Sequence, residues 1–231
     1  MKLSVIMAAY NEKDTILTAL QRVQAADISP WEKEIIIVDN CSTDGTREIL
    51  QGLEQNEHLR IIFQPRNMGK GTSIRTAIPH CTGDYTIIQD ADLEYDPFEW
   101  PLLLEKAVAE DLDAVYGSRT LGGRATYVYV QNYLGVRFLT WLTNLLFGTN
   151  YTDVATACKM VRTSVLKSLN LTCSGFDLDF ELSNKLGKNG YRVGEVPITY
   201  RPRSLEEGKK IRPWDGLGAV RVILRDRFRS D

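Results

Sequence analysis

Two carboxylates, Asp90 and Asp92, stand one residue apart, directly after the strand-like segment 84–89. Side chains along a strand alternate between its two faces, so residues i and i+2 point the same way. Both carboxylates can therefore face one point, where they could hold a hard divalent cation that bridges the phosphates of a nucleotide. The two charges also repel each other, so a bound cation would relieve an electrostatic cost. The alternative interpretation is a solvated turn at a strand end, where acidic residues are common.

The residues that follow this pair favour a metal site. Glu94 offers a third oxygen ligand two residues further along the chain, and the dipeptide at 96–97, Asp-Pro, closes the turn. Oxygen ligands are those that Mg²⁺ and Mn²⁺ prefer in proteins. We therefore expect Asp90, Asp92 and Glu94 to bind Mg²⁺ or Mn²⁺.

Two other polar motifs end strand-like runs. In AYNE, Tyr10 could stack on a nucleobase and Glu12 could accept a hydrogen bond from one. In VDNCSTDGT, the carboxylate of Asp39 and the amide of Asn40 could bind the edge of a base. Each motif can equally be an ordinary helix start with capping residues, and the residues alone leave both interpretations open.

The glycine-rich segment 67–72, NMGKGT, resembles a phosphate-binding loop in composition. It is not one, because Lys70 is followed by glycine and no glycine stands five residues before it. We interpret the segment as a helix start whose glycines allow close packing and whose amides face outward. The chain also lacks a GxGxxG motif after its first strand-like run, which argues against a dinucleotide dehydrogenase.

The elements that must position these residues follow an α/β pattern. Apolar, β-branched runs alternate with helical patterns through the first hundred residues, and such runs predict a parallel sheet covered on both faces. Ligands bind at the carboxyl ends of strands in sheets of this kind, where Asp39 and Asp90 stand. We predict an α/β fold, Rossmann-like, with a mostly parallel twisted sheet and helices on both faces. The expected strands are 3–7, 34–39, 59–63, 84–89, 113–119 and 193–200, and the expected helices lie near 16–23, 127–147 and 180–186.

Composition excludes several classes of protein. The 231 residues carry a net charge of -2, so no global attraction to nucleic acid is expected. The sequence has no stretch of about 18 uninterrupted apolar residues, so no membrane-spanning helix is expected. The first residues also lack the pattern of a signal peptide. We therefore expect a cytoplasmic protein with reduced thiols and no zinc site. The cysteines and histidines, none at metal-ligand spacing, are Cys41, Cys81, Cys158, Cys173, His58 and His80.

The motifs AYNE, VDNCSTDGT, NMGKG and DADLEYDP occur in this order at familiar distances. They resemble family 2 glycosyltransferases with the GT-A fold, and most closely the dolichyl- or polyprenyl-phosphate sugar synthases, such as dolichol-phosphate mannose synthases. The resemblance continues through GSR, TDVAT, GFD and EVPI, so it covers nearly the whole chain. It implies a single GT-A domain over 1–231, with a nucleotide-sugar-binding half at 1–120 and an acceptor-binding half at 121–231.

The resemblance also implies roles for the matching residues. Arg119 would approach the sugar or the phosphates, Arg203 and Lys209 would close over the diphosphate and the acceptor phosphate, and Asp153 would lie near the acceptor as a candidate base. The implied catalytic residues are Asp92, Asp153, Arg119 and Arg203. The implied contacts to the nucleotide diphosphate sugar are Ala8, Tyr10, Glu12, Val38, Asp39, Asn40, Asp90, Ala91, Asp92, Arg119, Arg203 and Lys209.

Three positions depart from the family pattern. Relatives commonly have proline where this chain has Ala8, and often glutamine where it has Glu94. They commonly have two aspartates where this chain has Asp39 and Asn40. The last departure touches recognition of the base, so a GDP donor and a UDP donor both remain open.

The implied reaction is an inverting, metal-dependent displacement that moves a hexose from a GDP-mannose or UDP-glucose type of donor to a polyprenyl or dolichyl phosphate. Such an acceptor is already ionised near neutral pH, because its second pKa is about 6, and it needs little help from a base. A sugar hydroxyl would need one, which would be Asp153. The alternatives are a glycan hydroxyl acceptor, or a non-catalytic nucleotide-sugar-binding subunit with a membrane-protein partner.

Two segments suggest contact with a membrane surface. Segment 127–147 has an apolar, aromatic helical face that suits either a membrane interface or a buried core. The tail is basic and amphipathic, which suits an anionic surface. Because some relatives continue into membrane-spanning helices and this chain stops, we expect peripheral attachment to the cytoplasmic face of a membrane. A further acidic group, Asp177, Asp179 and Glu181, spreads over more than one helical face. Glu181 and Asp179 could line the acceptor site, and a solvated helix start is the alternative.

Overall fold

The computed structural model describes residues 1–123, 130–203 and 213–228. Within these residues seven strands form one sheet in the order β3-β2-β1-β4-β6-β5-β7. All neighbouring strands run parallel except β6, which is antiparallel to both β4 and β5. The predicted mostly parallel sheet is therefore confirmed. The strands are β1 (Lys2–Ala9), β2 (Glu32–Asp39), β3 (Leu59–Phe63), β4 (Tyr85–Asp90), β5 (Ala114–Ser118), β6 (Lys159–Arg162) and β7 (Val193–Pro197).

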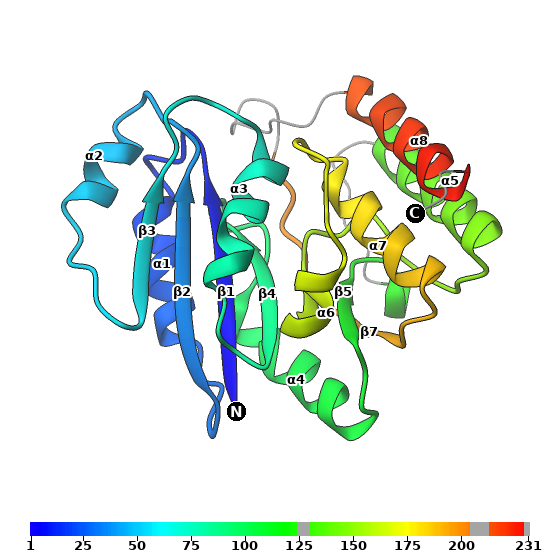
Figure 1. Cartoon of the computed structure of the whole chain (residues 1–231), viewed down its shortest axis with the longest axis horizontal. Coiled ribbons are helices and arrows are strands. Elements are labelled where there is room, and N and C mark those ends of the chain that lie inside the picture. The colour runs from blue at the N-terminus through cyan, green and yellow to red at the C-terminus, as the bar shows by residue number, and fades with distance from the viewer. Residues whose placement is uncertain (124–129, 204–212, 229–231) are drawn as a thin grey trace.

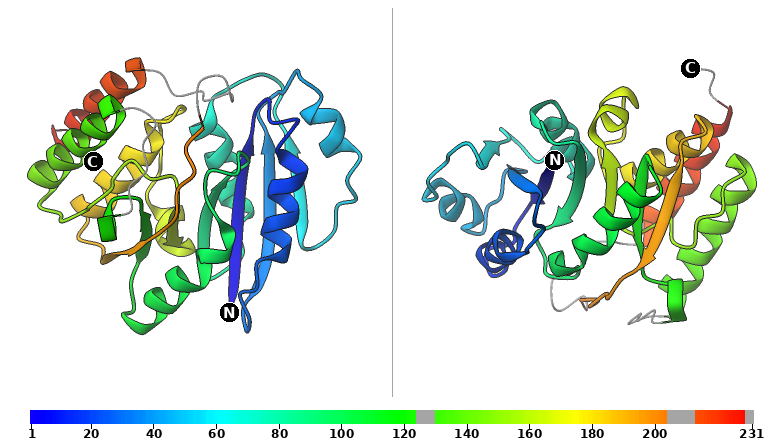
Figure 2. Two further views of the ribbon diagram at one scale, coloured as in Figure 1. Left: turned by 180° about the vertical axis from the view of Figure 1, so that it is seen from behind. Right: turned by 90° about the horizontal axis from the view of Figure 1, so that it is seen from below.

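Helices lie on both sides of the sheet, with α1 and α3 on opposite sides of β1 and β2 (Figures 1 and 2). The helices α5, α7 and α8 pack together beside the β5–β7 end of the sheet. The helices are α1 (Ile16–Ala25), α2 (Thr46–Gln51), α3 (Lys70–Ala77), α4 (Trp100–Ala109), α5 (Val130–Phe147), α6 (Thr163–Ser168), α7 (Leu178–Lys188) and α8 (Pro213–Phe228). Short 3₁₀ turns are η1 (Ile78–His80), η2 (Pro97–Glu99) and η3 (Leu121–Gly123).

The alternation along β1 explains why both faces are covered. Leu3, Val5 and Met7 pack into one buried cluster, whereas Ile6 between them packs into a second cluster on the other face. The first cluster includes apolar residues of α1 and α4, and the second includes residues of α3, α5, α6, α7 and α8. A strand with no solvated face needs apolar residues at nearly every position, as the run from residue 3 to residue 7 shows.

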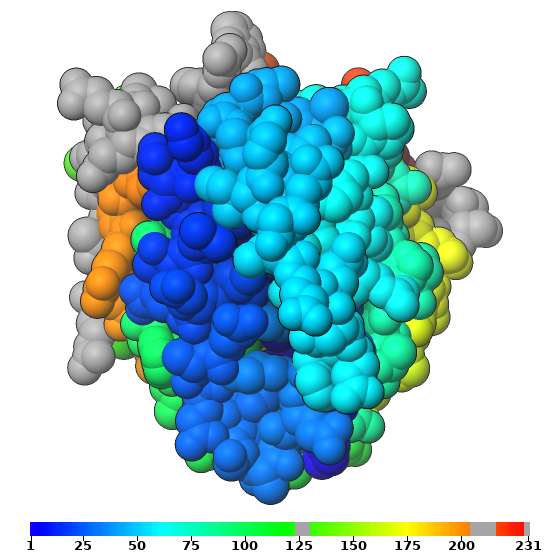
Figure 3. Space-filling model, turned by 90° about the vertical axis from the view of Figure 1, so that its left-hand side faces the viewer, coloured from blue at the N-terminus to red at the C-terminus, as the bar shows by residue number. Residues whose placement is uncertain are grey.

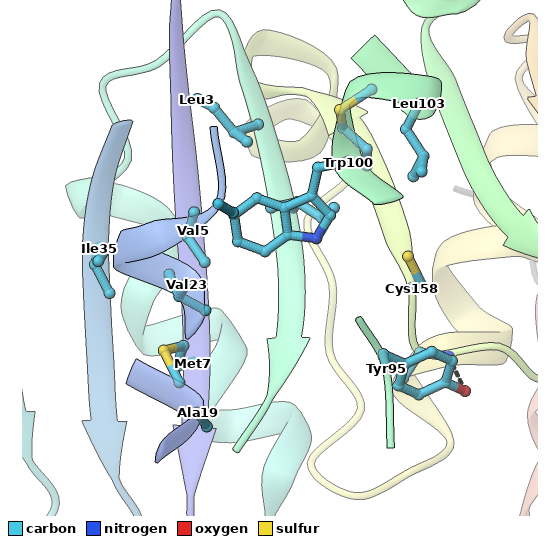
Figure 4. Close-up of a cluster of buried hydrophobic side chains, with 14 of the residues drawn as sticks. Leu3, Val5, Met7, Ala19, Val23, Ile35, Tyr95, Trp100, Leu103 and Cys158 are labelled. Carbon is cyan, nitrogen blue, oxygen red and sulfur yellow. Dashed lines mark hydrogen bonds between the residues drawn. The ribbon is translucent and has the colours of Figure 1, made fainter. Parts of the chain in front are cut away.

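The first cluster is centred on large buried side chains (Figure 4). The indole of Trp100 is fully buried, and its neighbours in the cluster include Val5 of β1, Val23 of α1 and Leu103 of α4. This packing holds the α1 and α4 layers against the strands whose carboxyl ends carry the polar motifs.

Strand β6 was not predicted from the sequence, for a physical reason. It is four residues long and begins and ends with Lys159 and Arg162, so it lacks an apolar run. The side chain of Lys159 is nevertheless fully buried, because its ammonium group finds carbonyl partners inside the protein. Because a buried lysine stands in place of an apolar residue, the hydropathy pattern did not indicate this strand.

Strand β3 is the opposite edge of the sheet, and α2 lies on that side of the molecule, which faces the viewer in Figure 3. Segments from the first 75 residues, coloured blue to cyan, cover most of that side of the molecule (Figure 3). Among the described residues, no helix has both the length and the hydropathy that crossing a bilayer requires.

Candidate functional site

A cavity of about 1100 Å³ opens at the carboxyl ends of β1 and β4. One wall comes from these strand ends and the loops that follow them, and the facing wall comes from α5 and the start of α7. Its position agrees with the rule for ligand sites in parallel sheets. The lining includes ten of the sequence-predicted site residues: Ala8, Tyr10, Glu12, Asn40, Asp90, Ala91, Asp92, Glu94, Arg119 and Arg203.

Three other predicted residues lie behind the cavity wall. Val38 belongs to the second hydrophobic cluster, and Asp153 is fully buried beneath Arg119. Asp39 is also fully buried, where Oδ2 accepts a hydrogen bond from Arg47 Nε at 2.6 Å. Contacts of these three residues with a nucleotide stay predictions. The predicted Lys209 lies outside the described residues.

Asp90 is paired with a lysine that sequence analysis did not place in the site. Lys70 Nζ lies 2.7 Å from Oδ1 and 3.0 Å from Oδ2 of Asp90. Lys70 is the first residue of α3, and the glycines on either side of it pack against backbone carbonyls: a Cβ on Gly69 would collide with Ser174 O, and one on Gly71 would lie 2.7 Å from Cys173 O. The predicted packing role of the glycines is confirmed. The same packing brings Lys70 to Asp90.

The guanidinium of Arg203 joins three carboxylates in the cavity. Its Nη2 lies 2.6 Å from Asp92 Oδ2, its Nη1 3.1 Å from Glu12 Oε2, and its Nε 3.4 Å from Glu94 Oε1. Glu94 also accepts hydrogen bonds from the backbone N–H of Arg203 and from the hydroxyl of Tyr200. Residues from the first and the last parts of the chain thereby form one charged cluster.

Burial and neighbouring charges shift the pKa values of both Asp92 and Arg203. Burial, followed by the charges of Asp90 and Glu94, raises the pKa of Asp92 to about 7, although Arg203 opposes the shift. For Arg203, burial acts to lower the pKa, but the carboxylates of Asp92 and Glu12 outweigh it and the pKa is raised. Burial thus disfavours the charged form of Asp92, and the neighbouring carboxylates add to that effect.

The two aspartates of the DAD motif form ion pairs with different basic side chains. Strand β4 ends at Asp90, so the period-two rule that would aim both side chains alike does not extend to Asp92. Asp90 contacts Lys70 and Asp92 contacts Arg203. In the part of the chain that the structure describes, no three His, Cys, Asp or Glu side chains are grouped as metal ligands. The carboxylates of Asp90, Asp92 and Glu94 still fit Mg²⁺ or Mn²⁺ chemically, because oxygen donors are the ligands that these ions prefer.

Arg119 and Asp153 form a buried bidentate pair. Nε and Nη2 of Arg119 lie 2.7 and 2.8 Å from the two carboxylate oxygens, and the backbone N–H of Arg119 donates to Oδ2 at 3.0 Å. Burial acts to raise the pKa of Asp153, but Arg119 outweighs it and the pKa is lowered. The guanidinium also lies over the ring of Tyr200, 5.1 Å from its centroid. Asp153 therefore positions Arg119 at the cavity wall.

The three acidic residues near the start of α7 separate into different roles. Glu181 is buried and accepts hydrogen bonds from the backbone N–H groups of Thr172 and Cys173. Asp177 accepts from the N–H of Gly175. Asp179 alone among the three acids lines the cavity.

Residues 4–169 match the family model described as glycosyl transferase family 2. The chain belongs to this family. The low-salt glycan biosynthesis hexosyltransferase Agl6 of Haloferax volcanii is 29% identical over 226 residues, which are 96% of this chain and 53% of that protein. A dolichol-phosphate mannosyltransferase of Pyrococcus furiosus is 28% identical over 216 residues, which are 90% of this chain and 59% of that protein. This family 2 chain thus spans about half the length of such curated relatives.

A solved structure supports the fold assignment. Glucosyl-3-phosphoglycerate synthase of Mycobacterium tuberculosis, solved with Mg²⁺ and uridine diphosphate, superposes with a TM-score of 0.70 at 19% identity, over all of this chain and 80% of the other. The predicted GT-A fold of this family 2 member is therefore confirmed.

Proposed function

We propose that this family 2 domain is an inverting hexosyltransferase that uses a nucleotide diphosphate sugar and Mg²⁺ or Mn²⁺, with a polyprenyl or dolichyl phosphate as acceptor. The observation that carries the proposal is the charged cluster of Arg203 with Glu12, Asp92 and Glu94, beside Lys70 and Asp90, in one cavity at the carboxyl edge of the sheet. A site of this kind suits a diphosphate with a divalent cation.

Each part of the cluster has a role in this proposal. Asp92 and Asp90, with Glu94 beside them, would hold the ion, which when bound neutralises charge on the leaving diphosphate. The cations Arg203 and Lys70 then stabilise the charge that develops as the diphosphate departs. Arg119, held by Asp153, faces the sugar or the phosphates, so Asp153 acts on the reaction through Arg119.

The base-binding end of the donor site is assigned to Asn40 and Tyr10. Both line the cavity, and Asn40 is held in one orientation, because its Oδ1 accepts from Met68 N at 2.7 Å and its Nδ2 donates to Asn67 Oδ1 at 3.0 Å. An oriented amide can pair with the edge of a guanine or a uracil, so donors of the GDP-mannose and UDP-glucose types are both candidates.

The lipid acceptor is supported by the character of the facing wall. Helix α5 lines the cavity on one side and exposes a stripe of large apolar side chains on another. A second stripe lies on α8, and each contains an exposed arginine at helical spacing, Arg137 on α5 and Arg221 on α8. Apolar stripes with cations suit an anionic membrane surface, from which a lipid phosphate would enter. The exposed apolar residues are Val130, Leu134, Phe138, Trp141 and Leu145 on α5, and Leu217, Leu224 and Phe228 on α8.

The test is transfer from radiolabelled GDP- and UDP-hexoses to polyprenyl phosphate in vesicles with Mg²⁺ or Mn²⁺, measured as label in the organic phase. We expect wild-type protein to form a lipid-linked sugar, and Asp92→Asn to lower the rate about 100-fold or more. The matched control is Asp14→Asn, which changes an exposed aspartate outside the cavity. Unchanged transfer by Asp92→Asn with metal present would show that the catalytic-metal assignment is wrong.

A glycan hydroxyl is the second candidate acceptor, because the relative Agl6 is named for glycan biosynthesis. A parallel assay with a lipid-linked saccharide in place of the lipid phosphate separates the two. A chain that uses the saccharide and ignores polyprenyl phosphate is a family 2 enzyme with a hydroxyl acceptor. Binding of donor with transfer to neither acceptor would instead support a non-catalytic nucleotide-sugar-binding subunit.

A further inference from the structure

Asp179, the second residue of α7, is a cavity residue that the proposed mechanism does not use. Its side chain is 9% exposed. Within the described residues its Oδ1 is a buried oxygen without a hydrogen-bond donor. Leaving a buried carboxylate oxygen without a donor costs free energy, so a ligand that brings hydroxyl groups would relieve that cost.

Two ammonium groups balance the charge of Asp179 without occupying its oxygens. Lys70 Nζ lies 3.9 Å from Oδ2 and Lys159 Nζ lies 3.9 Å from Oδ1, both beyond hydrogen-bond distance. Lys159 donates instead to the backbone carbonyls of Val154 and Asp179, at 2.8 Å each. It thereby ties the first turn of α7 to the loop before β6, and it acts as a positioning residue.

The location of Asp179 points to the sugar of the donor. Lys70 Nζ lies within 4 Å of carboxylate oxygens of both Asp90 and Asp179, so the two acids flank one ammonium group. The hexose of a nucleotide diphosphate sugar is bonded to its β-phosphate, so a diphosphate held at Asp90 and Asp92 brings the hexose next to Asp179. The ring of Phe176, 5.8 Å from Lys70 Nζ, lines the same part of the cavity.

We propose that Asp179 is a specificity-determining residue that accepts hydrogen bonds from hydroxyl groups of the donor hexose. A carboxylate has two acceptor oxygens, which suits two neighbouring hydroxyls of a sugar ring, and Phe176 provides an apolar surface for the ring itself. The inference rests on the proposed function, because it assigns the sugar subsite of the same cavity.

The test measures binding by isothermal titration to the whole chain with Mg²⁺, using GDP and UDP, the matching nucleotide hexoses, and donors that lack one sugar hydroxyl. We expect wild-type protein to bind at least one monodeoxy donor about 10- to 100-fold more weakly than the parent donor, because a hydrogen bond to a charged group is lost. Asp179→Asn is expected to weaken binding of the parent donor similarly, to bind that deoxy donor with no further loss, and to bind the nucleoside diphosphate within about twofold of wild type. The matched control is Asp177→Asn, two residues away and outside the cavity lining.

The wild-type deoxy series does not depend on whether Asp179→Asn folds, and thermal unfolding of the variant checks its fold. If Asp179→Asn binds the parent donor as tightly as wild type and still rejects the deoxy donor, the sugar assignment is overturned, even where turnover is lost. Equal binding of all deoxy donors by wild type overturns it too, while donor binding and the proposed function stand. If wild type binds no nucleoside diphosphate at all, the proposed function falls and this inference with it.

Discussion

The two walls of the cavity are built in different ways. The strand-end wall is polar, and its charged groups meet in short contacts, as in the pairs Lys70–Asp90 and Arg203–Asp92. The helical wall mixes apolar residues such as Leu139 with Asn132 and Asp179. Away from the cavity lining, α5 and α8 leave large side chains such as Trp141 and Phe228 exposed to solvent, at 55% and 77%. The charged groups of the strand-end wall thus find partners within the described residues, whereas large apolar side chains of α5 and α8 stay partly in solvent.

Replacing a tryptophan in each region gives the largest expected contrast. Trp100→Ala removes a fully buried indole from the first hydrophobic cluster, so we expect the free energy of unfolding to fall by about 3–5 kcal/mol. Trp141→Ala removes an exposed indole from α5, so we expect a change within about 0.5 kcal/mol. Denaturant unfolding measures both, and equal losses would contradict the comparison.

The next largest effect concerns the charged cluster. Arg203→Ala leaves Glu12, Asp92 and Glu94 without their shared guanidinium, so we expect sugar transfer to fall about 100- to 1000-fold. Arg203→Lys is expected to recover only part of the rate, because an ammonium group cannot contact three carboxylates as a planar fork does. The matched control is Arg201→Ala, which removes an exposed side chain two residues away. A control as inactive as Arg203→Ala would show that the segment, and not the guanidinium, is required.

Acid unfolding tests two buried carboxylates, Glu34 of β2 and Glu181 of α7. Burial raises the pKa of Glu34, but hydrogen bonds from Lys2, Ser4 and Thr82 outweigh it and lower the pKa to about 2. Because the folded pKa lies below the unfolded value, this stabilisation is complete above about pH 4.5 and is lost as the pH falls toward 2. After a discount for solvent screening, we expect Glu34→Gln to remove roughly 2 kcal/mol of pH-dependent stability over that range.

Glu181 of α7 serves as the companion measurement. Burial raises its pKa, and hydrogen bonds from Cys173, Thr172 and Lys185 lower it to about 2, so Glu181→Gln is expected to flatten the same pH range. Urea unfolding at pH 7, 4.5 and 3 tests both variants. An unchanged pH dependence in either one would show that its carboxylate is not held in the ionised form by the fold.

The smallest expected effect tests the exposed stripes. We expect Phe138→Ser to weaken binding to vesicles containing anionic lipid about 10-fold, because the exposed ring would bury apolar area in the membrane interface. Stability and hydrolysis of the donor by water should stay as in wild type. Phe98→Ser, which changes an exposed phenylalanine near α4, is the matched control. Equal vesicle binding by both variants would contradict a membrane-facing role for α5.

Local sequence patterns predicted the strands of the strand-end wall better than the contacts between its side chains. Near-continuous apolar runs revealed β1 to β4, and their ends located Asp39 and Asp90. Pairing between elements was not visible: Lys70 reaches Asp90 only because α3 packs close to the segment around Ser174. The predicted convergence of Asp90 and Asp92 also assumed a strand that continues, whereas β4 ends at Asp90.

Helical periodicity predicted helix α5, but the sequence did not predict which charged residues of this region are buried. The stripe on α5 follows from helical spacing, and the structure shows that its large members face solvent. Lys159 begins the four-residue strand β6 and Asp153 stands outside any helix or strand, so neither follows a periodic pattern. Their positions depend on carbonyls and on Arg119, which the fold brings to them from elsewhere. Burial of a charged group depends on tertiary partners, which one-dimensional patterns do not contain.

The contact between Arg203 and Glu12 joins residues 191 positions apart. A chain synthesised from its N-terminus therefore exposes Glu12, Asp92 and Glu94 without their guanidinium until residue 203 has been made. We expect ribosome-bound chains that end before residue 203 to be cleaved by protease at the carboxyl edge of the sheet, and longer ones to resist. The charged cluster would thus close only after all the strands that the structure describes have been synthesised.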